Sequence, residues 1–243
     1  MRATFDAGGE VAIVTGGAQG IGAALARGYA QAGGHAAVFD VASSPELEGL
    51  PNVSQQLVDV SDREAVQAAV RQVVAERGRV DALVAGAAVQ PRTAVADMEP
   101  SEWRHTLAVN LDGVVWAAQA VLVHMRPARR GAIIVYSSGL ALAGRAEASA
   151  YAASKGALIP FAKSLAAEVA RDRIRVNVVF PGVIDTEQFR AANSGDERRH
   201  WEKTTGIGTP EDVVGPLLFL LSDAATMTGS TLTRDRVFSQ EAT

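Results

Sequence analysis

The sequence predicts an α/β protein built on a doubly wound parallel sheet, with helices on both faces in three α/β/α layers. Short apolar runs that suit buried strands alternate along the chain with longer stretches of helical periodicity. The first apolar run leads directly into a glycine-rich turn that opens a helix. The 243 residues contain no Pro/Gly/Ser-rich linker, low-complexity tract or internal repeat. We therefore expect a single domain spanning residues 1–243.

The first element is a strand at Val11–Thr15. It continues into Thr-Gly-Gly-Ala-Gln-Gly-Ile-Gly at residues 15–22, and a helical pattern follows over Ala23–Ala32. Glycines let a backbone approach a diphosphate closely, and the N-terminus of a helix favours its negative charge. Because strand, turn and helix occur in this order, they predict a Rossmann-type dinucleotide-binding fold. A glycine-rich turn without a ligand is the alternative.

The second strand, His35–Asp40, ends in an acidic residue beyond the glycine-rich turn. A carboxylate at this place can accept hydrogen bonds from the adenosine ribose hydroxyls, and it repels a 2′-phosphate. Val41 follows at a position where a phosphate-binding protein would carry Arg or Lys. We therefore expect NAD as cofactor, with NADP disfavoured. The alternative is that Asp40 is only a turn residue at the end of a strand.

Strands and helices continue to alternate along the rest of the chain. Ser61 and Glu64 have the spacing of a capping box, which opens a helix to about residue 77. A longer helix is expected over 99–125, ended by Arg126-Pro127, and Thr209 followed by a proline suits the start of a helix to residue 221. The remaining predicted elements are strands at 54–60, 80–84, 131–138, 174–180 and 229–233, and a helix that includes residue 151 and ends at about 171.

Ser138, Tyr151 and Lys155 form a candidate reaction centre. Tyr151 and Lys155 are four residues apart on a predicted helix, so they share one face, and a nearby cation favours the phenolate and lowers the pKa of the phenol. Ser138 ends the apolar strand before that helix, where its hydroxyl can hold a substrate oxygen against the tyrosine. Taken alone, Tyr-x-x-x-Lys is more often an ordinary solvated helix face.

Together these motifs resemble the short-chain dehydrogenase/reductase family, over nearly the whole chain from residue 11 to about 229. The loop spacing Thr-Gly-x-x-x-Gly-x-Gly is that family's version, and both Asn110 in Val-Asn-Leu-Asp-Gly and the segment Pro-Gly-x-Ile-x-Thr at 181–186 match further family motifs. The resemblance implies that Tyr151 transfers the hydroxyl proton and that Ser138 polarises the substrate oxygen. It implies that Lys155 lowers the pKa of the phenol and binds the nicotinamide ribose, while the backbone of Asn110 holds a relay water.

The resemblance also implies a set of cofactor-binding positions. Asp59 and Val60 are expected at the adenine, and the backbone near Ile184 and the hydroxyl of Thr186 at the nicotinamide carboxamide. Gln19 stands where NADP-preferring relatives often carry a basic residue. The complete set is Gly16, Gln19, Gly20, Ile21, Gly22, Asp40, Asp59, Val60, Ala85, Gly86, Tyr151, Lys155, Pro181, Gly182, Ile184 and Thr186.

Three segments depart from the family pattern or vary within it. Ala-Gly-Ala-Ala at 85–88 replaces the usual Asn-Asn-Ala-Gly, which puts cofactor affinity in question, and Asp235-Arg236-Val237 replaces the usual Asp-Gly-Gly. Residues 187–209 match the family's variable substrate-binding lid, with Phe189 and Trp201 as its only large apolar residues. The cationic side chains of this lid either attract an anionic substrate or, as such charges more often do, only face solvent; they are Arg190, Arg198, Arg199 and Lys203.

Composition narrows the class of protein further. The net charge of −4 gives no indication of a nucleic-acid or membrane partner, and the absence of cysteine excludes disulfides and thiolate metal sites. The four histidines lack the spacing of a metal site and are expected to be structural or surface residues, so no metal is predicted. The N-terminus lacks the apolar core of a secretory signal, and no segment is expected to reach the length of a membrane span. A cytoplasmic location is therefore the default.

The resulting hypothesis is an NAD-dependent oxidoreductase that transfers a hydride between nicotinamide and a small secondary alcohol or ketone, such as a sugar or cyclic alcohol. Tyr151 would act as its general acid/base. An NADPH-dependent ketone or 3-oxoacyl reductase is the first alternative, and a non-catalytic dinucleotide-binding regulator the second. Family resemblance implies a homotetramer or homodimer.

Overall fold

The computed structural model describes residues 3–234, so the departure at Asp235–Val237 lies outside the described residues. Its strands are β1 Val11–Thr15, β2 His35–Asp40, β3 Val53–Leu57, β4 Ala82–Ala85, β5 Gly131–Tyr136, β6 Ile174–Phe180 and β7 Thr231–Thr233. They form one sheet in the order β3-β2-β1-β4-β5-β6-β7, and every neighbouring pair is parallel. The winding direction reverses between β1 and β4, which is where doubly wound sheets bind ligands. The predicted fold class is confirmed.

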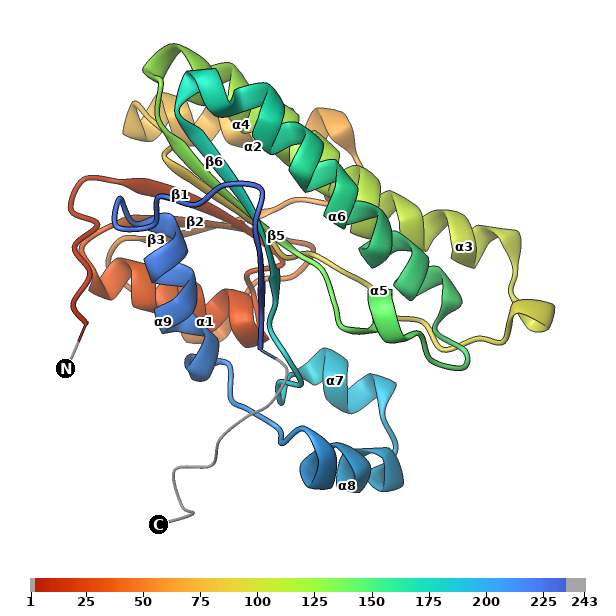
Figure 1. The fold of residues 1–243 in the computed structure, drawn as a ribbon. Coiled ribbons are helices and arrows are strands. Elements are labelled where there is room, and N and C mark those ends of the chain that lie inside the picture. Colours follow the sequence, from red (N-terminus) through yellow and green to blue (C-terminus); the bar gives the residue numbers. More distant parts are fainter. Residues whose placement is uncertain (1–2, 235–243) are drawn as a thin grey trace.

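Helices cover both faces of this sheet (Figure 1). Their bounds are α1 Gly20–Gln31, α2 Arg63–Arg77, α3 Pro100–Leu107, α4 Gly113–Ala128, α5 Leu140–Ala143, α6 Ser149–Val169, α7 Glu187–Ala192, α8 Gly195–Thr204 and α9 Glu211–Leu221. One layer contains α2, α4 and α6, and the other contains α1 and α9. The short helices α7 and α8 stand apart from both layers, beyond one end of the sheet.

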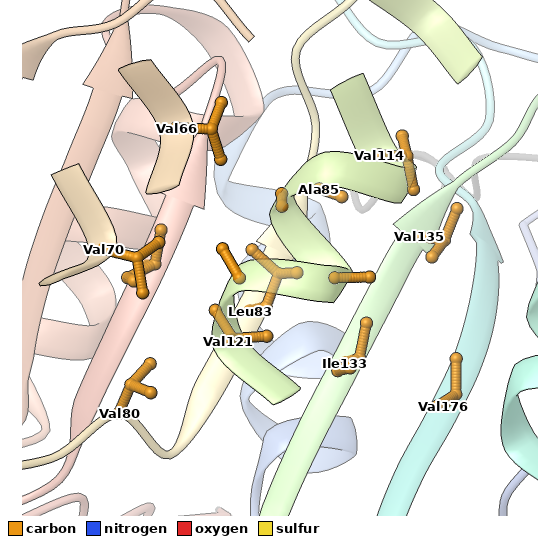
Figure 2. Close-up of a cluster of buried hydrophobic side chains, with 14 of the residues drawn as sticks. Val66, Val70, Val80, Leu83, Ala85, Val114, Val121, Ile133, Val135 and Val176 are labelled. Carbon is orange, nitrogen blue, oxygen red and sulfur yellow. The ribbon is translucent and has the colours of Figure 1, made fainter. Parts of the chain in front are cut away.

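The central strands are apolar along their whole length because both of their faces are covered. Ile13 in β1, Leu83 in β4 and Ile133 in β5 are fully buried, as parallel sheets between two helical layers require. Valines from α2 and α4, among them Val70 and Val121, pack onto this surface (Figure 2). Burial of each such side chain contributes about 1.5–3 kcal/mol relative to exposure. This core holds the carboxyl ends of the strands in fixed positions.

The single long helix expected over 99–125 is interrupted. A π-helical turn, Ala108–Asp112, separates α3 from α4, and α4 continues through Pro127 to Ala128 instead of ending before the proline. π-Helical turns insert one extra residue per turn and occur frequently at functional sites. Asn110 lies inside this turn. An apolar periodicity near 3.6 does not distinguish a π turn from continuous α-helix, so the sequence missed it.

Two expected helix caps are wrong. The cap of α2 is Asp62, whose carboxylate accepts hydrogen bonds from two backbone amides of the first turn, while Ser61 bonds to Asp59 instead. At α9 the Thr209 side chain does not cap; the backbone amide of Thr209 donates to Asp212 at 2.8 Å. At α2 the Asp62 carboxylate takes the role expected of Ser61, since carboxylates are strong acceptors at helix N-termini. The expected strands at 54–60 and 80–84 are also shifted, to β3 and β4.

The stretch Pro100–Ala128 is, by length and composition, long and apolar enough to cross a membrane, contrary to the sequence expectation. Half of its most apolar window is buried inside the fold (50%). Its buried residues belong to the core shared with α2 and the sheet. The apolar residues of this stretch therefore pack in the core of the fold.

Candidate active site

A cavity of about 860 Å³ opens at the carboxyl ends of the strands. Segments that follow β1, β2, β3, β4, β5 and β6 line it, together with α7 and α8. Sixteen of the predicted site residues line this cavity: Gly16, Gln19, Gly20, Ile21, Gly22, Asp40, Asp59, Val60, Gly86, Ser138, Tyr151, Lys155, Pro181, Gly182, Ile184 and Thr186. Two predicted residues, Asn110 and Ala85, lie behind its wall, both of them buried.

The glycine-rich turn is so tight that it has no room for a side chain at Gly16 or Gly22. Gly16 has a φ of +68°, and a Cβ there would lie 2.6 Å from the backbone of Ala87. A Cβ on Gly22 would collide with the carbonyl oxygen of Gly16. The hydroxyl of Thr15 accepts a hydrogen bond from the Gly86 amide at 3.2 Å, which fastens the turn to β4. The result is a bare backbone cradle at the N-terminus of α1, and such a cradle fits a diphosphate.

Asp40 lies at the end of β2, beside this cradle. One carboxylate oxygen accepts a hydrogen bond from the Ala18 amide at 3.0 Å, and the other accepts one from the Ala42 amide at 3.3 Å. The carboxylate therefore supports the glycine-rich turn and the strand-end turn while it lines the cavity. The side chain is half-buried, so its oxygens keep acceptor capacity toward a ligand.

Asp59 and Val60 follow β3 on the same side of the cavity. Hydrogen bonds from the Ser61 hydroxyl and amide hold the pKa of Asp59 below its usual value. Val60 is buried against Gly113, where an added Cβ would meet the valine side chain at 2.7 Å. His105, read from sequence as structural, also lines the cavity, and its charge adds a smaller lowering of the Asp59 pKa.

Ser138, Tyr151 and Lys155 meet in the cavity between β5 and α6. The Lys155 ammonium donates to the Tyr136 carbonyl at 2.8 Å and lies 6.0 Å from the centroid of the Tyr151 ring. Lys155 is only 2% exposed, and burial lowers its pKa to about 8. Burial also raises the pKa of Tyr151, while a hydrogen bond with Ser138 lowers it. The net shift of the phenol is upward, opposite to the expected direction, because removal from water outweighs the favourable contacts.

Asn110 acts through its side chain within the fold. Its amide oxygen accepts a hydrogen bond from the Val89 amide at 2.8 Å, and its nitrogen donates to the Val89 carbonyl at 2.9 Å and to the Ser154 hydroxyl at 3.0 Å. The side chain is fully buried, and every polar atom of its amide has a partner. Asn110 thus joins the segment after β4 to the helix that carries Tyr151 and Lys155.

Comparison with known proteins decides the family. The family model described as short chain dehydrogenase matches residues 10–197. The chain belongs to the short-chain dehydrogenase/reductase family. It is therefore an oxidoreductase.

Three relatives illustrate the range of similarity within the family. The chain is 33% identical to a 3-oxoacyl-[acyl-carrier-protein] reductase of Chlamydia trachomatis, covering 93% of this chain and 96% of the relative. It is 36% identical to a D-threitol dehydrogenase of Mycolicibacterium smegmatis, covering 92% and 90%. A crystal structure of a short-chain type dehydrogenase/reductase from Mycobacterium marinum superposes with a TM-score of 0.88 at 32% identity, covering 95% and 96%.

The departure from the family pattern at 85–88 has a structural counterpart on the next strand. Ala85 is buried in the sheet. At Gly86 an added Cβ would lie 3.1 Å from the ring of Tyr136. The tyrosine ring thus occupies the space that a family asparagine at 86 would need, and its hydroxyl is buried without a protein partner among the described residues. The sequence did not single out Tyr136, because the pairing depends on sheet register.

The sequence also missed the contacts that hold the segment 187–209 against the body of the protein. Arg145, in the loop between α5 and α6, contacts Asn193 and Glu197 of that segment. Arg92, in the loop after β4, donates to the Ala192 carbonyl at 3.1 Å. No motif marks either arginine, and their roles follow only from the position of α7 and α8 over the cavity mouth. His200 packs edge-on against Trp201, with ring centroids 5.2 Å apart.

Proposed function

We propose that the protein is an NAD-dependent oxidoreductase that transfers a hydride between nicotinamide and a secondary alcohol or ketone, with Tyr151 as general acid/base. The observation that carries the proposal is one cavity that contains the glycine cradle, Asp40 and the group Ser138, Tyr151 and Lys155. The cradle fits the diphosphate of a dinucleotide, and the hydroxyl-bearing group fits an alcohol or a carbonyl. The catalytic and cofactor roles of these residues are part of the proposal.

In the direction of oxidation, the substrate hydroxyl donates its hydrogen bond to Tyr151 while the Ser138 hydroxyl fixes the substrate oxygen. A dinucleotide held by the glycine cradle and Asp40 would supply the acceptor for the hydride that leaves the carbinol carbon. Tyr151 accepts the hydroxyl proton as the carbonyl forms, so the products are ketone, reduced dinucleotide and one proton. Lys155, whose pKa is about 8, exchanges its own proton near neutral pH and stabilises the phenolate when charged.

Asp40 supports the proposed preference for NAD. Its carboxylate lines the cavity beside the glycine cradle, and Asp59 is a second acid that lines the cavity. Two carboxylates there repel a 2′-phosphate and accept hydrogen bonds from ribose hydroxyls. Val41, the next residue, is exposed and uncharged. Both sequence neighbours of Asp40, Phe39 and Val41, line the cavity, and neither carries a positive charge.

The alternative is an NADPH-dependent ketone or 3-oxoacyl reductase. Relatives named as 3-oxoacyl-[acyl-carrier-protein] reductases cover nearly the whole chain. Relatives named D-threitol dehydrogenase and probable galactose dehydrogenase match at similar identity, and these names support alcohol oxidation. Asp40 is the feature that favours an alcohol dehydrogenase that uses NAD over an NADPH-dependent reductase.

Tyr151→Phe tests the proposal. The variant is expected to reduce NAD at least 100-fold more slowly over a panel of secondary alcohols, because a general acid/base contributes about 10²–10⁴-fold. Its affinity for NADH, measured by fluorescence titration, should stay within about threefold. Tyr29→Phe is the matched control, since Tyr29 is equally buried but bonds to Glu10 outside the cavity. Turnover by Tyr151→Phe at the wild-type rate would contradict the assignment, and NADH binding without any turnover by the wild type would favour the regulator.

We further propose a cytoplasmic homotetramer or homodimer. The outer surface of α4 and α6 carries a groove lined by Leu122, Val123 and Phe161, and Val123 is 66% exposed. Apolar grooves of this kind support association through a second copy of the chain. Light scattering at micromolar concentration measures the assembly; a monomer at every concentration would contradict it.

A further inference from the structure

The lid end of the cavity contains a charge cluster that is neutral as a whole. We call it the lid cluster; it consists of Arg92, Arg145, Glu147 and Glu197. Arg145 pairs with Glu197, and Arg92 lies 3.5 Å from Glu197 and 3.2 Å from Glu147. Two cations and two carboxylates therefore cancel at the side of the cavity where the lid meets the body. This arrangement bears on which substrates the site can accept.

Arg145 is the member of the cluster that lines the cavity. Its side chain is 16% exposed. One terminal nitrogen donates to Asn193 at 2.8 Å and the other donates to Glu197, while its guanidinium lies 5.7 Å from the centroid of the Trp201 ring. Both terminal nitrogens of the guanidinium therefore have hydrogen-bond partners, and the guanidinium also lies close to the Trp201 ring. A substrate carboxylate would have to displace Glu197 before it could pair with this arginine.

The remaining lid arginines are also paired. Arg190 and Arg198 both contact Asp185, at 2.9 and 3.0 Å, and Arg199 pairs with Asp196. None of these three arginines lines the cavity, which favours the expectation that the lid cations face solvent. Their ion pairs balance charge within the lid and leave no free guanidinium among these residues for an anionic ligand.

Uncharged groups line the cavity nearby. Gln188 in α7, two residues after Thr186, has an amide nitrogen that is buried without a hydrogen-bond partner among residues 3–234. Gln90, after β4, also lines the cavity. Phe189 and Trp201 supply apolar walls. An unpartnered buried amide costs about 1–3 kcal/mol, which a ligand hydroxyl or carbonyl oxygen relieves.

We propose that the substrate is an uncharged alcohol with at least one further hydroxyl group, a polyol or cyclic diol, bound by Gln188, and that Glu197 excludes carboxylate-bearing alcohols by occupying Arg145. This inference rests on the proposed function, because it places the alcohol in the same site. Glu197 acts on specificity by pairing with Arg145, so that an anionic substrate meets no unpaired guanidinium at the lid end of the cavity. Arg234, the other described arginine that lines the cavity, pairs with Asp212 at 3.5 Å. Gln188 favours the hydroxyl-bearing substrate because its amide nitrogen can donate a hydrogen bond to the further hydroxyl group.

Glu197→Gln tests the exclusion. The amide keeps the size of the side chain and an acceptor for the Ser194 amide, a bond of 2.7 Å in the wild type, while it removes the charge opposite Arg145. Glu202→Gln on the same helix is the matched control, because Glu202 pairs only with Arg198 at the lid surface, among the described residues. The probes are cyclohexane-1,2-diol and 4-hydroxycyclohexanecarboxylate, titrated by calorimetry into the enzyme saturated with NADH. Binding is measured directly and does not depend on turnover.

The wild type and Glu202→Gln are expected to bind the diol at least tenfold more tightly than the carboxylate. Glu197→Gln should bind the carboxylate at least tenfold more tightly than the wild type does, with the affinity for the diol within about threefold. Gln188→Leu should weaken binding of the diol about tenfold and leave the affinity for cyclohexanol unchanged. Equal binding of diol and carboxylate by the wild type would overturn the substrate class, and an unchanged Glu197→Gln would overturn the role of Glu197.

Turnover with NAD, followed at 340 nm on the same protein preparations without added NADH, separates this inference from the proposed function. Diol binding without NADH formation by the wild type would refute the proposed oxidation and leave the selection by charge intact. Turnover of both probes at equal efficiency would refute the selection and leave the oxidation intact.

Discussion

Replacing Lys155 with methionine should change how the stability of the protein depends on pH. The side chain is buried, and its pKa falls from 10.5 to about 8 because burial disfavours the charged form. Between these two values the unfolded chain holds the proton that the native protein has released, so the free energy of unfolding rises with pH. From pH 7 to pH 9.5 the two pKa values give the wild type a gain of about 2 kcal/mol over Lys155→Met, at 1.36 kcal/mol per pKa unit.

The assay is urea unfolding followed by circular dichroism at half-unit steps between pH 7 and pH 9.5, at one protein concentration and without dinucleotide. Loss of the 2.8 Å hydrogen bond to the Tyr136 carbonyl costs Lys155→Met a constant amount, about 1–3 kcal/mol, so it offsets the curve without changing its slope. Lys163→Met, an exposed lysine on the same helix, is the control, and its curve should run parallel to the wild type. Parallel curves for Lys155→Met as well would refute the reasoning.

The remaining predictions concern the cradle, the sheet and the lid. Gly22→Ala should weaken NADH at least tenfold in fluorescence titration, because its Cβ would collide with the loop backbone, whereas Gly215→Ala, whose Cβ meets nothing within 4 Å, should stabilise α9 by up to about 1 kcal/mol. Asp81→Asn should lower the urea midpoint by the equivalent of about 1–3 kcal/mol, since this buried carboxylate accepts the first β1 amide at 2.9 Å; an unchanged midpoint would contradict this. Hydrogen bonding from the Ser194 amide, then Arg145, lowers the pKa of Glu197 to about 2. Its contribution to holding the lid against the body is therefore complete above pH 4.5 and is lost as pH falls toward 2. Trp201 fluorescence should report that loss, and Glu197→Gln should abolish the transition.

Much of the fold was predictable from the sequence because its signals are local. The apolar strands, the glycine-rich turn and the spacing of Tyr151 and Lys155 each depend on a few adjacent residues. The doubly wound parallel sheet followed from the alternation of strands and helices, since right-handed crossovers leave few topologies.

The features that the sequence missed depend on residues far apart in the chain. The ring of Tyr136 fills the space at Gly86 through the pairing of β4 with β5, and Arg145 contacts Glu197 across 52 positions. The direction of the Tyr151 pKa shift was wrong for a related reason. The spacing to Lys155 shows a neighbouring cation, but the burial that outweighs it is a property of the whole fold.

Fluorescence titration of NADH and NADPH into the wild type and Asp40→Ala tests the NAD-linked account most directly. The account predicts at least tenfold tighter binding of NADH by the wild type, because Asp40 lines the cavity beside the glycine cradle and a carboxylate there repels a 2′-phosphate. Asp40→Ala should gain NADPH affinity, although loss of the 3.0 Å bond to the Ala18 amide will weaken both ligands somewhat. NADPH binding by the wild type that equals or exceeds NADH binding would contradict the account and place the NADPH-dependent reductase first.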